Sequence, residues 1–184
     1  MRIKKLLWGL RSLIYKLTFK KFGNWSYIGT PIVLDGVRNV EIGNRVRIQP
    51  GLRLETIGNE GSIIIEENTS IGQNFHITSK GKLTIGKNTT ILGNVFITNI
   101  DHDYQEIDKH ILEQKYIVND TVIGENCFIG YGAAIQAGTK LGKQCIVGTN
   151  SVVRGEFPDY SVIVGAPARI VKQYNHSTKV WERV

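Results

Sequence analysis

The sequence predicts an all-β fold, a parallel β-helix of hexapeptide repeats with an N-terminal amphipathic helix and a protruding loop. The main observation is an aliphatic residue that returns every six positions, a period that fits neither an amphipathic helix nor an alternating strand. Three hexapeptides make one triangular coil of about 18 residues. The period is carried by Ile42, Ile48, Leu54, Ile65, Ile71, Ile77, Ile85, Ile91, Ile97, Ile123, Ile129, Ile135, Leu141, Val147 and Val153.

A second register supports the same fold. Four residues after an aliphatic position stands another inward residue, usually small: Val46, Leu52, Thr69, Phe75, Thr89, Val95, Cys127, Ala133, Thr139, Cys145 and Ser151. The two cysteines are therefore expected to be core residues of a chain in a reducing cytoplasm, rather than a disulfide or a metal pair. Glycine follows the aliphatic residue where we expect corners that need a positive φ, at Gly43, Gly72, Gly86, Gly124, Gly130, Gly142 and Gly148. Asn68, Asn88, Asn126 and Gln144 supply a second corner-tolerant residue type.

Residues 1–22 are predicted to form a basic amphipathic helix. They hold seven of the 23 basic residues and no acidic residue, which leaves 16 of each sign in the rest of the chain. The apolar face comprises Ile3, Leu6, Leu7, Leu10, Leu13, Ile14 and Leu17. This helix either lies on an anionic membrane surface, with Trp8, Tyr15 and Phe19 near the headgroups, or caps the prism or packs in an oligomer. No apolar run is long enough to span a membrane, and no cleavage site indicates a removed signal peptide.

The β-helix domain is expected to cover residues 23–174, with its period starting near Ile28 and Leu34. Short additions fall around residues 58–61 and 80–81. After Ile97 the period resumes only at Ile123, so residues 99–119 are expected to leave the prism as a loop. Long insertions in compact folds are usually functional or disordered. Residues 175–184 lack the period and are expected to form a frayed or weakly docked C-terminal tail.

These features resemble the hexapeptide-repeat acyltransferases, especially the galactoside and maltose O-acetyltransferases and the O-acetyltransferases of capsule and lipopolysaccharide synthesis. The resemblance covers about residues 74–172. Its most specific parts are the His-bearing loop directly after a coil and the ending Gly165-Ala-Pro-Ala-Arg169. It implies a left-handed β-helix, an exception to the usual right-handed crossover. It also implies a homotrimer that uses acetyl-CoA as co-substrate, with no metal.

The resemblance implies that His102 is the general base, removing a proton from a sugar hydroxyl as the oxygen attacks the thioester. Imidazole suits this task because its ordinary pKa lies near working pH. No Ser or Cys nucleophile with an adjacent base is evident, which favours direct transfer over an acyl-enzyme. The alternative for His102 is a solvated loop histidine.

Four residues are acceptor-binding candidates. Asn74 and His76 lie on the coil beneath the loop, and the family commonly has Asn where this chain has His76, which indicates a different sugar. Asp101 is expected to orient His102 or bind a sugar hydroxyl, and Tyr104 to stack on a sugar ring. Asp101 and Tyr104 could equally be ordinary loop residues.

Eight residues are candidates for binding acetyl-CoA. Phe128 occupies a position where relatives carry a Trp beside the pantetheine arm. Gly130, Tyr131, Gly148 and Thr149 follow the same edge, where small residues leave room for pantetheine. Basic side chains for the phosphates are expected from Arg154, Arg169 and Lys172; the alternative for Arg154 and Lys172 is a solvated surface charge.

The expected function is acetyl-CoA-dependent O-acetylation of a sugar hydroxyl, on a surface-polysaccharide intermediate. The expected location is the cytoplasm, peripheral on the inner membrane face if the helix binds lipid. Two alternatives stay open: a prism-fold zinc enzyme of the carbonic anhydrase type using His76, His102 and His110, and a non-catalytic scaffold. A nucleic-acid partner is not expected, because the prism is neutral and the basic segment is apolar on its other face.

Overall fold

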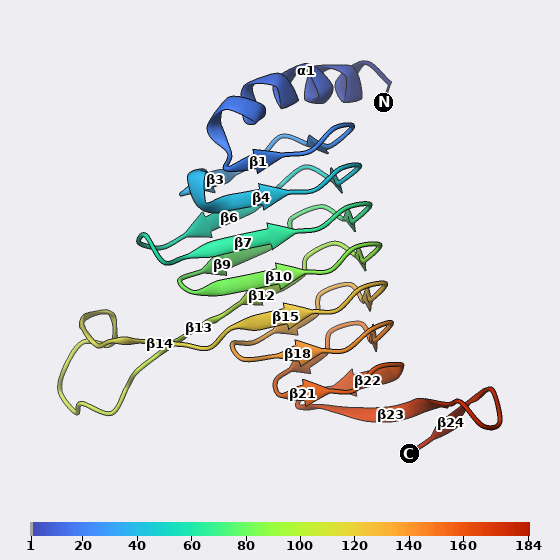
Figure 1. Cartoon of the computed structure of the whole chain (residues 1–184). Helices are drawn as coiled ribbons and strands as arrows, with labels where there is room; N and C mark the ends of the chain where they lie inside the picture. Colours follow the sequence, from blue (N-terminus) through green and yellow to red (C-terminus); the bar gives the residue numbers. More distant parts are fainter. Residues whose placement is uncertain (1) are drawn as a thin grey trace.

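The computed structural model describes the backbone of residues 2–184 and, within the N-terminal helix, the side chains from Leu7 onward. The side chains of Ile3 and Leu6, part of the predicted apolar face, lie outside the described residues. The chain forms a helix, α1 (Arg2–Thr18), followed by a prism of stacked coils (Figure 1).

Three parallel sheets make the three faces of the prism. Face A contains β1 (Lys21–Phe22), β4 (Val40–Ile42), β7 (Ser62–Ile65), β10 (Lys82–Ile85), β15 (Thr121–Ile123), β18 (Lys140–Leu141) and β21 (Glu156–Phe157). Face B contains β2 (Tyr27–Ile28), β5 (Arg47–Ile48), β8 (Ser70–Ile71), β11 (Thr90–Ile91), β16 (Phe128–Ile129), β19 (Ile146–Val147) and β22 (Ser161–Gly165). Face C contains β3 (Val33–Asp35), β6 (Arg53–Thr56), β9 (His76–Ser79), β12 (Phe96–Thr98), β17 (Ala134–Ile135) and β20 (Val152–Val153).

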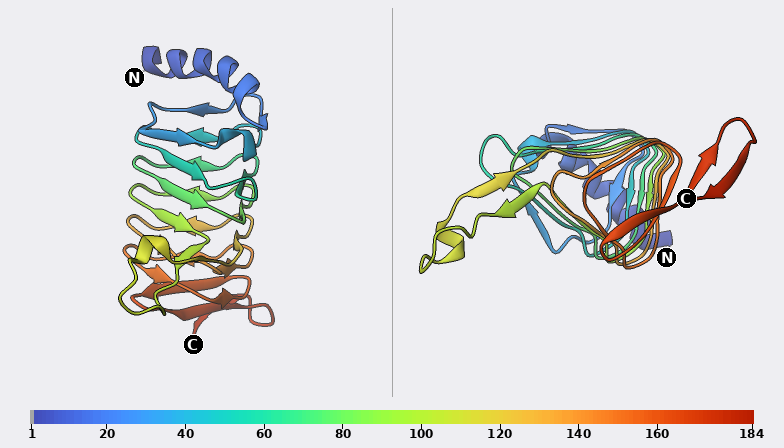
Figure 2. Two further views of the ribbon diagram at one scale, coloured as in Figure 1. Left: turned by 90° about the vertical axis from the view of Figure 1, so that its left-hand side faces the viewer. Right: turned by 90° about the horizontal axis from the view of Figure 1, so that it is seen from below.

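The winding is left-handed, as the resemblance implies. In the sheet nearest the viewer in Figure 1 the strands run from left to right while successive coils descend. Viewed along the axis, the coils superpose as a triangle, and the loop and the C-terminal ribbon project from different corners (Figure 2).

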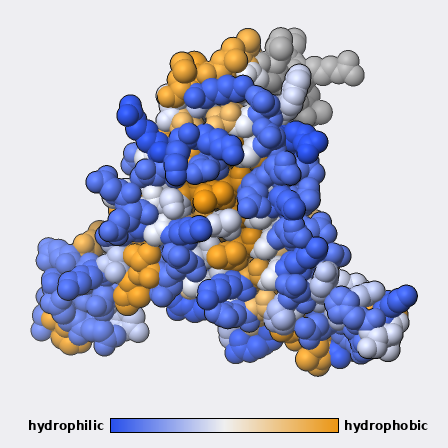
Figure 3. Space-filling model, in the orientation of Figure 1, coloured by the Kyte–Doolittle hydropathy of each residue, from blue (hydrophilic) through white to orange (hydrophobic). Residues whose placement is uncertain are grey.

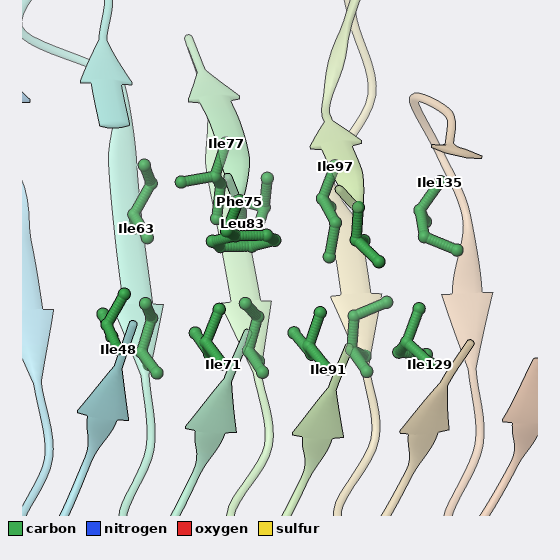
Figure 4. Packing of buried hydrophobic residues seen from close by; sticks show 14 of the residues in the cluster. Ile48, Ile63, Ile71, Phe75, Ile77, Leu83, Ile91, Ile97, Ile129 and Ile135 are labelled. Carbon is green, nitrogen blue, oxygen red and sulfur yellow. The ribbon is translucent and has the colours of Figure 1, made fainter. Parts of the chain in front are cut away.

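The six-residue period forms three columns inside the prism. On face A, Ile42 is in register with Ile65, Ile65 with Ile85, and Ile85 with Ile123. These side chains are at most 1% exposed, and the columns are visible in Figure 4. All residues of the second register are buried as well, and Cys127 and Cys145 are free thiols in the core. Both registers of the sequence prediction are confirmed.

The reason given for the recurring glycines is wrong. None of the seven has a positive φ; at the corners that conformation is adopted instead by residues such as Asn68, Asn88 and Asn126. Six of the seven are required by the backbone of the next coil; a Cβ on Gly86, for example, would lie 2.6 Å from the backbone nitrogen of Glu125. Real Cβ atoms do not approach so closely, so backbone contact between coils excludes a side chain. At Gly148 the nearest atom is in the side chain of Val164.

Helix α1 ends at Thr18, not at residue 22, because Lys21 and Phe22 already form the first strand of face A. The helix lies across the open end of the prism (Figure 1). The rings of Tyr15 and Phe19 pack against each other and against Phe22, with centroids 5.3–5.4 Å apart. Ser12 Oγ donates a 2.8 Å hydrogen bond to the carbonyl of Ser26. One face of the helix therefore closes the core.

The long loop leaves the corner between faces C and A and returns to it. Its base is closed by the backbone N–H of Asn119, which donates to the carbonyl of Asn99 at 3.0 Å. Two strands, β13 (Ile100–His102) and β14 (Tyr116–Val118), pair antiparallel within it, and a short 3-10 helix, η2 (Ile111–Glu113), lies at its far end. A second 3-10 helix, η1 (Val37–Asn39), precedes β4.

The C-terminal tail is not frayed. Strand β23 (Ala168–Asn175) turns back antiparallel on β22, and β24 (Val180–Arg183) pairs with β23. Trp181 packs edge-on against Tyr174 with ring centroids 5.6 Å apart. The loss of the six-residue period therefore marks a change from coils to an antiparallel ribbon.

The stacked columns predict a large difference between neighbouring isoleucines of β7. Ile65 is fully buried whereas Ile64 faces outward and is partly exposed. We expect Ile65→Ala to lower the free energy of unfolding by about 2–5 kcal/mol, through lost burial and a residual cavity. Ile64→Ala is the matched control, and its cost should stay below about 1 kcal/mol. Urea denaturation checks both variants; equal losses would contradict the assigned columns.

Candidate active site

A groove of about 310 Å³ lies where the loop joins face C. Its lining combines residues on or directly after four strands of face C, β6, β9, β12 and β17, with both arms of the loop: Ile57, Thr78, Phe96, Thr98, Ile100, Asp101, His102, Tyr116 and Gln136. Two sequence-predicted site residues, Asp101 and His102, are therefore brought together here. The groove offers a histidine beside hydroxyl, amide and aromatic groups.

Hydrogen bonds fix the point where the loop leaves the prism. Thr98 Oγ1 receives hydrogen bonds from Thr78 Oγ1 at 2.9 Å and from the backbone N–H of Ile100 at 3.1 Å. The carbonyl of Thr98 accepts from the hydroxyl of Thr121 at 2.9 Å. Asn99 is buried, and its Oδ1 accepts from the backbone N–H of Lys80 at 3.0 Å. Hydrogen bonds to the neighbouring coils thus hold the first residues of the loop in place.

His102 ends β13 and pairs with Tyr116 on β14. Their rings lie 4.9 Å apart at an angle of 60°, and the ammonium group of Lys80 lies 4.4 Å from the Tyr116 ring centroid. The imidazole is exposed to solvent at the edge of the groove. Its ring is therefore positioned by packing and remains accessible to a substrate.

Asp101 is paired with Arg154 rather than with His102. The Arg154 guanidinium, at the end of β20, donates to the Asp101 carboxylate. This pair ties the first arm of the loop to a coil 53 residues later in the chain. Arg154, a sequence candidate for CoA phosphates, thus lies on the acceptor side of face C.

His76 lies on β9 between Arg53 and Phe96 of the neighbouring strands. Its ring is 4.9 Å from the Phe96 ring, and its Nε2 is 3.7 Å from the Glu55 carboxylate. Burial lowers the pKa of His76, Arg53 lowers it further, and Glu55 partly offsets both. The hydrogen bond from Arg53 in turn holds the pKa of Glu55 below its usual value. His76 is outside the groove lining but on the same face.

Two acceptor candidates lie elsewhere. Asn74 is a corner residue with φ 54°, and its Nδ2 donates to Asn94 Oδ1 at 3.0 Å. Asn94 contacts the hydroxyl of Tyr131 in the same way, so Asn74 belongs to a polar ladder along the corner between faces B and C. Tyr104 is 68% exposed and lies further out in the loop.

The remaining donor candidates gather away from the groove, on face B and its corner with face C. Phe128 is exposed on β16, and Gly130 and Tyr131 follow it. Gly148 and Thr149 occupy the equivalent corner one coil later, with Thr149 N 2.6 Å from a Cβ built on Gly130. The last two donor candidates, Arg169 and Lys172, lie on β23, which pairs with β22.

His102 and most of the donor candidates thus lie at opposite ends of face C, although Asn74 shares the donor side and Arg154 the side of His102. Tyr131 precedes β17 and Gln136 follows it, and Gln136 lines the groove with His102. The turn at Tyr131 and Gly132 and the strand β17 separate the two ends. One copy of the chain therefore holds His102 apart from the corner between faces B and C.

Sequence reasoning missed several groove residues. Thr78, Thr98 and Gln136 each follow an inward residue of face C, so the period itself could have indicated them. Tyr116 could not be found in this way, because its place beside His102 depends on the pairing of β13 with β14.

The three histidines considered for zinc are not gathered. Among the side chains of residues 7–184, no group of three or more His, Cys, Asp or Glu is arranged to hold a metal ion. His110 caps η2, where its Nδ1 accepts from the backbone N–H of Leu112 at 3.2 Å.

Comparisons with known sequences agree with the fold and the family resemblance. Residues 120–155 match the family model described as bacterial transferase hexapeptide (six repeats). The chain is 34% identical over 180 residues to WbbJ of Escherichia coli strain K12, provisionally named a lipopolysaccharide biosynthesis O-acetyl transferase, covering 91% of this chain and 88% of that protein. It is 29% identical over 119 residues to the galactoside O-acetyltransferase of the same strain, covering 61% of this chain and 57% of that protein.

Two solved structures share the fold. AntD, an N-acyltransferase from Bacillus cereus in complex with dTDP-4-amino-4,6-dideoxyglucose and coenzyme A, superposes with a TM-score of 0.75 at 17% identity, over 91% of both chains. A galactoside acetyltransferase in complex with coenzyme A superposes with a TM-score of 0.61 at 22% identity, over 92% of this chain and 72% of that one.

The lowered pKa of His76 predicts a pH dependence of stability. In the folded protein burial disfavours the protonated form of this imidazole and lowers its pKa, whereas the unfolded chain takes up a proton near pH 6.5. The stability that this neutral ring contributes is present above that pH and is lost as pH falls through the lowered folded pKa. The free energy of unfolding should therefore fall more steeply below about pH 6.5 in the wild type than in His76→Asn. The same dependence of the free energy of unfolding on pH in both proteins, measured by urea titration, would contradict this prediction.

Proposed function

Since the chain belongs to the hexapeptide-repeat acyltransferases and is an acetyltransferase of that family, we propose that it transfers acetyl from acetyl-CoA to a sugar hydroxyl, with His102 as general base. The observation that carries this proposal is the groove in which the accessible imidazole of His102 meets the polar ends of face C. WbbJ, similar over most of its length, is named for O-acetyl transfer in lipopolysaccharide biosynthesis.

The proposed reaction is a direct transfer. His102 accepts the proton of the acceptor hydroxyl as that oxygen attacks the thioester carbonyl carbon. The tetrahedral intermediate collapses with cleavage of the C–S bond, and the imidazolium returns its proton to the departing thiolate of CoA. Tyr116 holds the ring in place by packing. Thr78 and Gln136 offer a hydroxyl and an amide for neighbouring sugar hydroxyls.

The donor is placed along the corner between faces B and C. Phe128 and Tyr131 are exposed there and would flank the narrow pantetheine arm, whereas the space that a side chain would fill at Gly130 is taken by the backbone of the next coil. Arg169 and Lys172 are exposed on β23, where positive charge suits the CoA phosphates.

The proposed enzyme is a homotrimer whose active sites lie between copies. We call the corner between faces B and C that carries Phe128 and Tyr131 the donor corner. Within one chain, His102 and the donor corner lie at opposite ends of face C, so the donor corner beside His102 must come from a neighbouring prism. The loop also exposes large apolar side chains, with Ile107 83% and Leu112 71% accessible. Contact with a second prism would cover them.

The proposed acceptor is an intermediate of a surface polysaccharide, modified in the cytoplasm at the inner membrane face. The name of WbbJ and the basic helix before the prism both support this choice.

His102 is tested by substitution. Acetyl-CoA turnover, followed by release of the free thiol in the presence of sugar acceptors, should fall about 10²–10⁴-fold in His102→Gln, because the base is lost. His110→Gln is the matched control, since that side chain lies in the same loop and should leave turnover unchanged. Acceptor-dependent turnover that survives in His102→Gln would remove His102 from the mechanism.

The shared site is tested by mixing two inactive variants. His102→Ala lacks the base, and Thr149→Trp blocks the donor corner on an exposed side chain. Unfolded together and refolded as mixed trimers, they should regain about one quarter of wild-type activity, because random pairing leaves that share of sites intact. Variants refolded separately are the control. No recovery in mixtures that form trimers would assign the site to a single chain.

A further inference from the structure

Helix α1 has an apolar face that the prism does not use. Tyr15 and Phe19 face inward and are 7% and 5% exposed, so the prediction that they lie near lipid headgroups is wrong. The aliphatic residues face the opposite way: Leu7, Leu10, Leu13, Ile14 and Leu17 are between 56% and 87% exposed. Figure 3 shows this apolar surface at the end of the molecule formed by α1. We call these five residues the outer face.

Basic side chains flank the outer face. Arg11 lies on one side of the helix, with its guanidinium directed to the carbonyl of Ile28. Lys16 lies on the other side and donates to Asn24, and Lys20 pairs with Glu41 of the first coils. No acidic residue occurs in residues 1–22. An aliphatic stripe between positive charges is the pattern of a helix that lies in the interface of an anionic bilayer.

A tryptophan extends this surface onto the prism. Trp25, at the first corner between faces A and B, has φ 61° and is 88% exposed. Together with Leu13 and Lys16 it borders a groove of about 600 Å³ between the helix and the first coil. Tryptophan is favoured at the headgroup level, where one part of the ring is apolar and the indole N–H stays wet.

We propose that the outer face docks on an anionic bilayer and stands the prism upright on it. A second copy of the chain fits this surface poorly, since end-to-end stacking would set Arg11, Lys16 and Lys20 against the same charges. Among residues 2–184, no helix is long and apolar enough to cross a membrane, so the contact is peripheral. The helix lies across the end of the prism (Figures 1 and 2), so the prism axis follows the membrane normal.

This orientation fixes the height of the active site, a consequence that rests on the proposed function. His102 follows β12, the last strand of the fourth coil. Three coil spacings of about 4.8 Å and the roughly 10 Å thickness of the helix place it about 25 Å from the surface. The acceptor sugar must therefore be carried on a spacer of several sugars. Prisms parallel to one three-fold axis would present three helices to the same bilayer.

Vesicle sedimentation of the full chain tests the docking. Phosphatidylcholine vesicles containing phosphatidylserine should bind the wild type, and vesicles of phosphatidylcholine alone should bind it at least about tenfold more weakly. Leu10→Glu combined with Leu17→Glu should weaken binding to the anionic vesicles at least about tenfold. Val180→Glu is the matched control: this side chain is 52% exposed at the opposite end of the prism and should bind as the wild type does.

Three results would overturn the docking: no binding by the wild type, equal binding by the double variant, or loss of the oligomer in that variant. The last would assign the outer face to a subunit contact. Turnover of a water-soluble acceptor should be unchanged in the double variant. Because sedimentation needs no turnover, absence of activity in every protein would count against the proposed function alone.

The height of the site is tested with acceptors on one lipid anchor. A long glycan in anionic vesicles should be acetylated at least about tenfold faster than a single sugar on that anchor, while both sugars free in solution serve equally. Equal rates on vesicles would overturn the upright orientation even if the helix binds.

Discussion

The spacing between stacked coils determines which residues can occupy the core and the corners of the prism. Stacked parallel strands must lie about 4.8 Å apart, so each side chain of one coil sits directly against its equivalent in the next. Inside the prism this requires like residues in columns, such as Ile42, Ile65 and Ile85 on face A. At the corners it leaves no space for a Cβ at Gly86 or Gly130. The same repetition creates the Asn74–Asn94 ladder and the donor corner.

The prism could be predicted from the sequence because its constraint repeats. Each coil needs inward aliphatic residues at equivalent positions, so the columns remained recognisable despite two insertions of a few residues. The ends could not be predicted in this way. Phe22 belongs to the first column of face A, six residues before Ile28, but it follows two lysines and a helical pattern that concealed the first coil. At the other end, β24 pairs antiparallel, a contact that has no six-residue signature.

The candidate site was only partly predictable for the same reason. His102 could be chosen because it follows directly after a coil, and the resemblance gave it a role. Its neighbour Tyr116 depends on how the loop folds back on itself. The pairing of Asp101 with Arg154 joins residues that only the stacking of later coils brings together. The position of Asn74 shows the limit of reading strands alone, since two residues before His76 the chain is already turning the corner.

The hydrogen bond between Asn119 and Asn99 closes the base of the loop, so the loop can change in length without disturbing the coils. Leu83 of β10 pairs with Thr121 of β15 as if no residues stood between the coils, because the Asn119–Asn99 hydrogen bond joins the ends of the excursion. Doubling the length of a flexible loop costs only about 0.6 kcal/mol in closure entropy. The part of the loop beyond the β13–β14 pair, residues 103–115, can therefore be lengthened, shortened or exchanged with little penalty to the coils beneath it, while His102 and the Asp101–Arg154 pair stay in place. Selection can therefore alter what is recognised at the corner between faces C and A, while the corner between faces B and C stays unchanged.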